Sequence, residues 1–359
     1  MIKSLFVISD GPECGKTLLS MGIALRFKNE GYKVGYFKPV ATEMKIEDAA
    51  PIDEDVELMK HVLDQDSSTE DMAPVMISHE FLEDFTSELR EEILEKITAA
   101  HRKLSKDFDI LIIEGARTPN VLSHLDLSSI SLAKIFNSSL LIVSKGSDDS
   151  IVDGIVHYKK MVDSEGCPLV GCVLNNIPRQ FTGRADKFVR KALEGNDIEI
   201  LGVIPEEKIL GSPTVEGVHE FIGGDLVEGK DHQDKLIEGI YIGALSTEGA
   251  RQYYSDFRDK ALITGGDRAD MAVAGIEAGV SLLILTGNLY PPNGVLTLAR
   301  LKKVPIILVP YDTFTTVKRL DAVTGRVKLW DKRKLEVYEQ TVSEFVDWKY
   351  VLKKVKGAD

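Results

Sequence analysis

Short apolar runs alternate with amphipathic stretches along the first half of the chain. Between the runs, apolar residues return every three or four positions, as in the helix expected from about Phe81 to Lys106. The runs have the length of buried strands and lie at Leu5–Ile8, Val34–Phe37, Ile110–Ile113, Leu140–Val143, Val170–Leu174 and Leu201–Ile204. Strands that alternate with helices predict an α/β fold with a doubly wound, mostly parallel sheet.

The same alternation continues after a Gly-Ser-Pro turn at residues 211–213. Apolar runs at 261–264, 281–285 and 304–309 end in small, hydroxyl or acidic residues, and helical patterns lie between them. The remaining stretch mixes charged residues with spaced aromatic and aliphatic ones. We therefore expect one α/β domain at residues 1–212, a smaller α/β domain at 213–328 and a tail of one or two helices at 329–359.

The turn after the first apolar run carries residues suited to binding phosphate. Its sequence is Ser9-Asp10-Gly11-Pro12-Glu13-Cys14-Gly15-Lys16-Thr17, and a helical pattern follows. Strand, glycine-bearing loop, Gly-Lys-Thr and helix form the context of a phosphate-binding loop, where backbone N–H groups and the helix dipole face one anion. We expect nucleotide contacts from Gly11, Glu13, Cys14, Gly15, Lys16, Thr17 and Leu18.

This loop departs from the usual spacing. The common pattern has glycine five residues before Gly15, at the position of Asp10, whereas the first glycine here is Gly11. The variant spacing excludes a standard kinase or GTPase loop. The alternative is an ordinary helix start with two glycines as turn residues.

Charged residues end two of the apolar runs. Lys38 follows the second run and Glu114 ends the third, so both would reach the sheet edge where parallel α/β folds bind ligands. Glu114 would lie beside the phosphates and could hold a metal ion, as could the hydroxyl of Thr17. Asp55 lies in the first turn of a helix that Asp53 can cap. Each residue also has a plainer alternative. Lys38 could be a solvated surface lysine and Glu114 a cap at the end of its strand. Asp55 could be one of the acidic residues that favour a helix N-terminus.

Two further places carry candidate ligand groups. Asn175 follows an apolar run, and its amide could contact adenine because it offers both a donor and an acceptor. In the second half, Gly265 and Gly266 would let backbone groups face a ligand. Asp267 and Arg268 could instead pair with each other and hold that turn, and both possibilities stay open.

Charge and composition narrow the class of protein. The chain has 359 residues and a formal net charge of −13, which argues against general nucleic-acid or anionic-membrane binding. The three cysteines, Cys14, Cys167 and Cys172, form no disulfide framework, and we expect the last two to be buried thiols. No apolar run approaches the length of a membrane span, and the chain shows no leader pattern. We expect a cytoplasmic globular protein.

The ordered motifs of residues 1–212 resemble dethiobiotin synthetase and its relatives, which include cobyrinate synthetases and the N-terminal region of long phosphotransacetylases. The motifs in order are Gly-Lys-Thr, Tyr-Phe-Lys-Pro-Val-Ala-Thr, Ile-Ile-Glu-Gly-Ala, Val-Leu-Asn-Asn-Ile-Pro and Gly-Val-Ile-Pro-Glu. The resemblance implies a P-loop NTPase fold with ATP and Mg²⁺ as cofactors. It implies that Lys16 and Thr17 bind the triphosphate, that Thr17, Asp55 and Glu114 ligate Mg²⁺, that Lys38 contacts an acyl substrate or the γ-phosphate, and that Asn175 contacts adenine.

The chain departs from dethiobiotin synthetase itself. The synthetase has an acidic residue at the position of Gly11, and its Gly-Ala-Gly-Gly segment is replaced by Gly115-Ala116-Arg117-Thr118. We therefore do not predict biotin synthesis. Residues 213–328 resemble the DRTGG domain through Ile-Thr-Gly-Gly-Asp-Arg-Ala-Asp and Val-Pro-Tyr-Asp-Thr-Phe-Thr-Thr. That resemblance implies a regulatory or assembly role and a homodimer or higher homo-oligomer.

Three interpretations of the function follow from these resemblances. The leading interpretation is a Mg²⁺-dependent, ATP-binding, ligase-like enzyme that activates a carboxylate or carbamate of a small-molecule substrate, with Lys16 and Lys38 as catalytic residues. The alternative is a non-catalytic, nucleotide-sensing regulatory dimer, because the loop is a variant and the sequence shows no acetyltransferase domain. Phosphotransacetylase activity itself is the weakest of the three interpretations.

Overall fold

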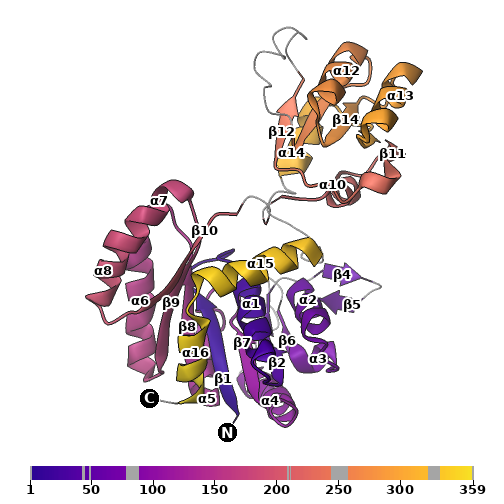
Figure 1. Cartoon of the computed structure of the whole chain (residues 1–359). Helices are drawn as coiled ribbons and strands as arrows, with labels where there is room; N and C mark the ends of the chain where they lie inside the picture. The colour runs from indigo at the N-terminus through magenta and orange to yellow at the C-terminus, as the bar shows by residue number, and fades with distance from the viewer. Residues whose placement is uncertain are drawn as a thin grey trace. The chain divides into compact units, whose positions relative to one another are not determined.

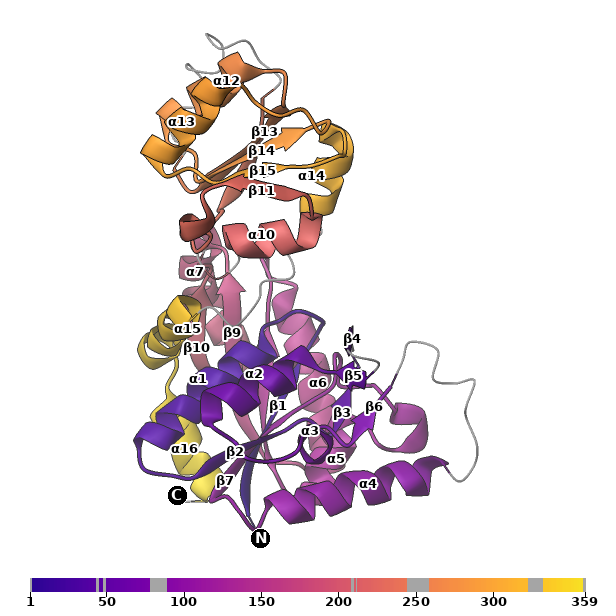
Figure 2. The same ribbon diagram turned by 90° about the vertical axis from the view of Figure 1, so that its right-hand side faces the viewer.

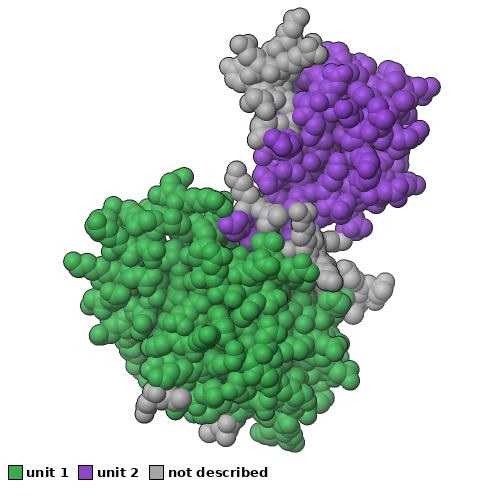
Figure 3. All heavy atoms as spheres, in the orientation of Figure 1, with its two compact units in different colours: residues 1–206, 335–359 green, residues 207–334 purple. Residues whose placement is uncertain are grey.

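Figures 1 and 2 show the computed structural model of the chain from two sides. It describes residues 2–42, 45–47, 50–77, 89–207, 210, 212–243, 258–321 and 332–357. The chain divides into two compact units, unit 1 with Met1–Glu206 and Leu335–Asp359, and unit 2 with Glu207–Lys334 (Figure 3). The last stretch of the chain thus belongs to unit 1, although it follows unit 2 in the sequence.

Unit 1 is built on a parallel sheet in the order β10-β9-β8-β1-β7-β2 (Figure 1). Its six strands are β1 (Lys3–Ser9), β2 (Val34–Phe37), β7 (Ile110–Glu114), β8 (Ser139–Ser144), β9 (Leu169–Ile177) and β10 (Ile200–Pro205). They correspond to the six apolar runs and are buried on both faces, as parallel strands between two helical layers are. The register pairs Val7 of β1 with Glu114 of β7, which brings the ends of these two strands side by side.

Helices cover both faces of this sheet (Figure 2). One layer holds α1 (Lys16–Asn29), α2 (Glu54–Leu63), α15 (Lys332–Phe345) and α16 (Trp348–Lys356). The other holds α4 (Leu89–Leu104), α5 (Ser129–Phe136), α6 (Ile151–Glu165), α7 (Arg179–Arg184) and α8 (Arg190–Glu194), with a π-helical turn at Ala185–Val189. The first residues of the helix expected from Phe81, up to 88, lie outside the described residues. The doubly wound α/β fold predicted from the sequence is therefore correct.

Smaller elements complete unit 1 near the β2 edge. A strand pair joins β3 (Val40–Ala41) to β6 (Val75–Met76), and another joins β4 (Lys45–Glu47) to β5 (Ala50–Ile52). The short helix α3 (Thr69–Met72) precedes β6, and a 3-10 turn lies at Ser123–Leu125. The strand pairs and α3 lie between β2 and α4 in the chain, and the 3-10 turn lies between β7 and α5.

Unit 2 is a second, smaller α/β sheet in the order β11-β15-β14-β13-β12. Its strands are β11 (Asp225–Glu228), β12 (Gly239–Ile242), β13 (Lys260–Gly265), β14 (Leu282–Thr286) and β15 (Ile306–Leu308). All pairs are parallel except β11 with β15. One face packs on α10 (Val215–Ile222) and α14 (Thr313–Asp321), the other on α12 (Ala269–Ala278) and α13 (Asn293–Lys302), and a 3-10 turn lies at Lys230–His232. Arg268, before α12, pairs with Asp270 at 3.3 Å.

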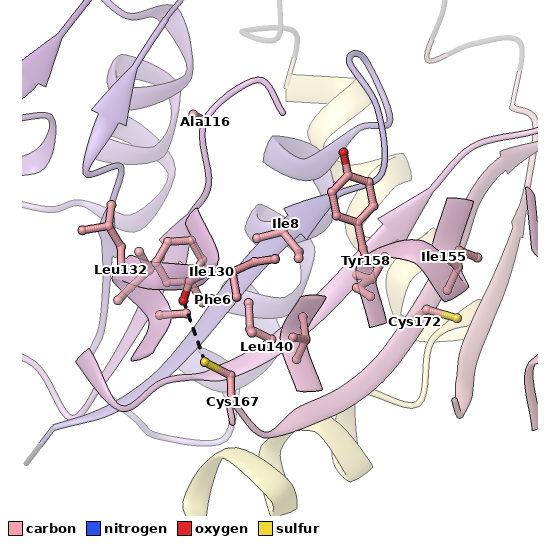
Figure 4. Packing of buried hydrophobic residues seen from close by; sticks show 14 of the residues in the cluster. Phe6, Ile8, Ala116, Ile130, Leu132, Leu140, Ile155, Tyr158, Cys167 and Cys172 are labelled. Atoms are coloured by element: carbon pink, nitrogen blue, oxygen red, sulfur yellow. Dashed lines mark hydrogen bonds between the residues drawn. The ribbon is translucent and has the colours of Figure 1, made fainter. Parts of the chain in front are cut away.

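The two cysteines outside the loop are buried in unit 1, as predicted (Figure 4). Cys167 donates to the carbonyl of Ile130 at 3.8 Å, and the hydrocarbon core surrounds Cys172. Burial raises the pKa of the Cys172 thiol to about 12. Both therefore act as small core residues. No helix among the described residues is long and apolar enough to cross a bilayer.

Helices α1 and α15 pack closely at Gly22. A Cβ atom there would lie 2.4 Å from Cγ2 of Val342, a stiff β-branched side chain. We expect Gly22→Ala to lower the free energy of unfolding by about 1–3 kcal/mol through overpacking. Gly183 in α7 has open space around it, so Gly183→Ala is the matched control and should be neutral or stabilising. Urea unfolding measures both; equal effects would contradict close packing at Gly22.

Candidate functional site

The turn between β1 and α1 leads into a helix terminus whose geometry suits an anion. Gly15, the residue before α1, has φ +81°, and a Cβ atom on it would lie 2.3 Å from Nδ2 of Asn175. Glycine is therefore required there. The helix begins with Lys16 and has no side-chain cap and no acidic residue in its first turn. Its first N–H groups have no partner within the helix and lie at the positive end of the dipole, which suits a phosphate.

Asp10 explains how the variant loop is held. Its carboxylate accepts hydrogen bonds from the Ser144 hydroxyl and from the Cys14 thiol, the latter at 3.5 Å. Burial raises the pKa of Asp10. Burial and the neighbouring Asp10 raise the pKa of Cys14 to about 11, so this cysteine is a neutral thiol at pH 7. The hydrogen bonds of these two side chains hold the loop. Asp10 occupies the position at which the common pattern has glycine.

Lys16 lies buried across the loop. Its amine donates to the Ser9 hydroxyl at 3.0 Å and to the carbonyl of Arg117 at 3.3 Å. Burial lowers the pKa of Lys16, since the protein replaces only part of its hydration. Both acceptors are neutral oxygens. An arriving phosphate would offer the amine stronger, charged acceptors.

Glu114 accepts hydrogen bonds on both carboxylate oxygens. Thr17 donates to Oε1 and the Tyr36 hydroxyl to Oε2, each at 2.9 Å. The Glu114 side chain is almost fully buried, and burial, followed by the nearby Asp55, raises its pKa to about 7. Tyr36 was missed by sequence reasoning. Its position in a strand predicted to be fully buried could have indicated it, because a buried phenol needs a hydrogen-bond partner.

Lys38 is buried in an ion-pair triad. Its amine lies 2.8 Å from Oδ2 of Asp53 and 2.7 Å from Oδ2 of Asp55. Burial alone would lower the pKa of Lys38, but the two carboxylates outweigh it and raise that pKa. Asp53 also caps α2 by accepting from the N–H groups of Asp55 and Val56, as predicted. The alternative of a solvated lysine is wrong, because only 4% of Lys38 is exposed.

Thr17, Asp55 and Glu114 offer the oxygen atoms that Mg²⁺ requires. Thr17 donates its hydroxyl proton to Glu114 at 2.9 Å. The two carboxylates lie close enough for Asp55 to raise the pKa of Glu114, and a divalent cation would offset that repulsion. The described residues hold no cluster of three or more His, Cys, Asp or Glu side chains arranged for a metal. The set fits Mg²⁺, which usually takes one or two carboxylates and fills its other positions with water and phosphate.

A pocket of about 560 Å³ opens beside the loop. It lies at the carboxyl ends of β8 and β9, and its volume is typical of a small-ligand site. The lining residues are Asp10, Gly11, Pro12, Glu13, Cys14, Lys145, Gly146, Ser147, Asn176, Pro178 and Glu206. Three of the predicted nucleotide contacts, Gly11, Glu13 and Cys14, are among them.

Asn175 lies beneath the loop. Its Nδ2 donates to the carbonyl of Cys14 at 2.9 Å, and its Oδ1 accepts from the Tyr338 hydroxyl at 3.1 Å. Its neighbour Asn176 is the amide that lines the pocket. The adenine contact of Asn175 stays a prediction, and sequence reasoning missed Asn176 and Tyr338. Among the other predicted residues, Thr17 hydrogen-bonds to Glu114, Lys38 forms an ion pair with Asp55, and the charge of Lys16 interacts with those of Glu114 and Asp55.

Profiles of two known families match the chain. The profile of a family described as an AAA domain matches residues 3–214, and that of the DRTGG domain matches residues 218–323. The phosphate acetyltransferase of Pseudomonas putida is 23% identical over 96% of this chain and 51% of its own length. That of Nitrosomonas europaea is 24% identical over 98% of this chain and 51% of its own length. The chain thus spans about half the length of these curated relatives.

Solved structures match each part at low similarity. The septum site-determining protein MinD of Pyrococcus horikoshii, complexed with Mg-ADP, is 16% identical over 58% of this chain and 84% of its own, with a TM-score of 0.37. The CBS and DRTGG domains of Clostridium perfringens pyrophosphatase, complexed with diadenosine tetraphosphate, are 22% identical over 36% of this chain and 60% of their own, with a TM-score of 0.29. Since the AAA profile covers more than half of the sequence, the chain belongs to the AAA domain family, with a DRTGG domain after the AAA domain.

Proposed function

We propose that unit 1 binds ATP together with Mg²⁺. The observation that carries this proposal is the pairing of Thr17, in the first turn of α1, with the buried carboxylate of Glu114 beside Lys16. The free N–H groups of α1 and the Lys16 amine would bind the terminal phosphates. Thr17, Glu114 and Asp55 would hold Mg²⁺, which neutralises triphosphate oxygens when bound.

We further propose that nucleotide sensing is the main role of this site. A ligase of the kind predicted from the sequence needs Lys38 to contact an acyl substrate or the γ-phosphate. Here the Lys38 amine is buried between Asp53 and Asp55, which leaves it little capacity for a substrate. ATP-dependent activation of a carboxylate is the second candidate, because Lys16, Thr17 and Glu114 together suit phosphoryl transfer.

Calorimetric titration of ATP with and without Mg²⁺ tests the shared part of both proposals. We expect ATP binding to require Mg²⁺. We expect the affinity to fall about tenfold to a hundredfold in Lys16→Ala, because the variant loses a charge-assisted contact to phosphate. Lys96→Ala removes an exposed lysine of α4 and is the matched control, with unchanged affinity expected. Binding that ignores both Mg²⁺ and the Lys16 substitution would contradict the proposal.

Turnover then separates the two candidate roles. Under nucleotide sensing, ATP binds stoichiometrically and ADP release stays negligible across candidate carboxylate substrates. Substrate-dependent ADP release that is lost in Lys16→Ala would instead support the ligase. ADP release that survives the Lys16 substitution would contradict catalysis at this loop.

A further inference from the structure

A side chain of α15 hydrogen-bonds to Asn175, the residue that supports the phosphate-binding loop. The Tyr338 hydroxyl on α15 donates to Oδ1 of Asn175, and Nδ2 of Asn175 donates to the carbonyl of Cys14. Both side chains are almost fully buried, so water does not compete for these bonds. Cys14 precedes Gly15, the residue that sets the start of α1. Two hydrogen bonds in series therefore join α15 to the loop.

The chemistry of the groups fixes the direction of this relay. The Cys14 carbonyl can only accept, so the amide nitrogen of Asn175 must face the loop. Its oxygen then faces Tyr338, and the phenol must donate. Phenylalanine at position 338 would keep the ring and leave the buried amide oxygen without its partner, which is the costly way to lose a hydrogen bond.

The same helix is fastened along α1. Glu339 forms an ion pair with Arg26 at 2.6 Å and accepts from the Asn29 amide at 3.3 Å. Gly22 lets Val342 approach the α1 backbone. Since α1 also carries the N–H groups of the phosphate-binding terminus, a movement of α15 would reach that terminus both through the helix and through Asn175.

One turn earlier, the first residues of α15 belong to unit 2. The division between the units falls between Lys334 and Leu335, inside this helix. The buried Lys334 amine donates to the carbonyl of Ser212, which belongs to unit 2. Tyr338, four residues later, bonds within unit 1. Successive turns of one helix thus make a buried hydrogen bond in each unit.

From this arrangement we infer that α15 couples the state of unit 2 to nucleotide affinity in unit 1, with Tyr338 as the positioning residue. The inference rests on the proposed nucleotide site. When α15 is docked, Asn175 holds the loop in its binding conformation; when α15 shifts, that hold is lost. By linkage, a nucleotide that prefers the docked state must also stabilise the docking of α15.

Titration of Mg²⁺-ATP into wild type, Tyr338→Phe and Tyr350→Phe tests the inference. Tyr350 lies on α16 in the same returning segment and donates to Glu199 at 3.3 Å, away from the loop. We expect the dissociation constant to rise about tenfold in Tyr338→Phe and to stay unchanged in Tyr350→Phe. Glu339→Gln, which weakens docking on α1 without touching the loop, should shift it in the same direction by less.

Hydrogen exchange of the α15 amides supplies a readout that a purely structural tyrosine would not move. In wild type and Tyr350→Phe, ATP should slow exchange in α15, and in Tyr338→Phe this effect should disappear. A Tyr338→Phe protein that melts lower but binds ATP with unchanged affinity, or wild-type α15 amides that ignore ATP, would overturn the inference alone. Absence of Mg²⁺-ATP binding by the wild type would overturn the proposed function and the inference together.

Discussion

Glu114→Gln is expected to stabilise the ligand-free protein at pH 8 by about 3 kcal/mol while it abolishes Mg²⁺-dependent nucleotide binding. The buried carboxylate of Glu114 has its pKa raised from an ordinary value of 4.5 to about 7, first by burial and then by Asp55. A shift of this size makes the ionised form costly in the folded state, at about 1.4 kcal/mol per pKa unit. Glutamine keeps the shape and removes the charge. It also removes a ligand from the proposed Mg²⁺ site.

The sign of the pH dependence follows from proton binding. Between pH 4.5 and about 7, the folded protein holds the Glu114 proton and the unfolded chain has released it, so the contribution of Glu114 to stability falls as pH rises. Below that window Glu114 is protonated in both states and does not change the stability. Above it Glu114 is ionised in both states, and the folded protein bears the full free-energy cost of the buried charge. Glu114→Gln should therefore match wild type near pH 4.5 and exceed it increasingly up to pH 8.

Urea unfolding in EDTA across this range measures the difference. Glu95→Gln, at an exposed position of α4, is the matched control and should follow wild type at every pH. A stability difference between Glu114→Gln and wild type that does not change with pH would show that Glu114 is ionised at no cost in the folded protein. That result would remove the electrostatic reason for a cation at this place.

The parts of the site that local sequence order determines were predictable. Lys16 and Thr17 follow a strand and open a helix, and Glu114 ends a second apolar strand. Parallel pairing of two such strands leaves little freedom, and the register of Val7 with Glu114 follows. The capping role of Asp53 is equally local, because its acceptor geometry depends only on the start of α2.

The remaining parts depend on contacts between distant segments. Nothing in the sequence near Asn175 indicates that Tyr338, 163 residues away, hydrogen-bonds to it. Neighbouring strand residues point to opposite faces, so which of Asn175 and Asn176 lines the pocket depends on the backbone at the end of β9, where Asn176 has φ +53°. The burial of Lys38 follows from the packing of α2 on β2, which periodicity alone does not specify.

Lys38→Met is expected to lower the free energy of unfolding by about 3–5 kcal/mol, the largest destabilisation we foresee. Its amine is the cation for the buried carboxylate of Asp53 and for Asp55. Removing one member of a buried ion pair leaves an uncompensated charge in a low-dielectric place. Lys134→Met breaks an exposed pair with Glu165 and is the matched control, with a cost below about 1 kcal/mol. Urea unfolding at pH 7 compares the two.

The double variant Lys38→Met/Asp53→Asn distinguishes charge from packing. Asparagine is also a good helix N-cap, so it can keep the contacts that Asp53 makes with the start of α2 while removing the stranded charge. If the triad is structural, the double variant should recover much of the stability lost in Lys38→Met. Equally small decreases in the free energy of unfolding for Lys38→Met and Lys134→Met would mean that Asp53 and Asp55 do not need the charge of Lys38 for the fold to be stable. Its amine would then be available to a substrate, and the ligase would become the better account of the site.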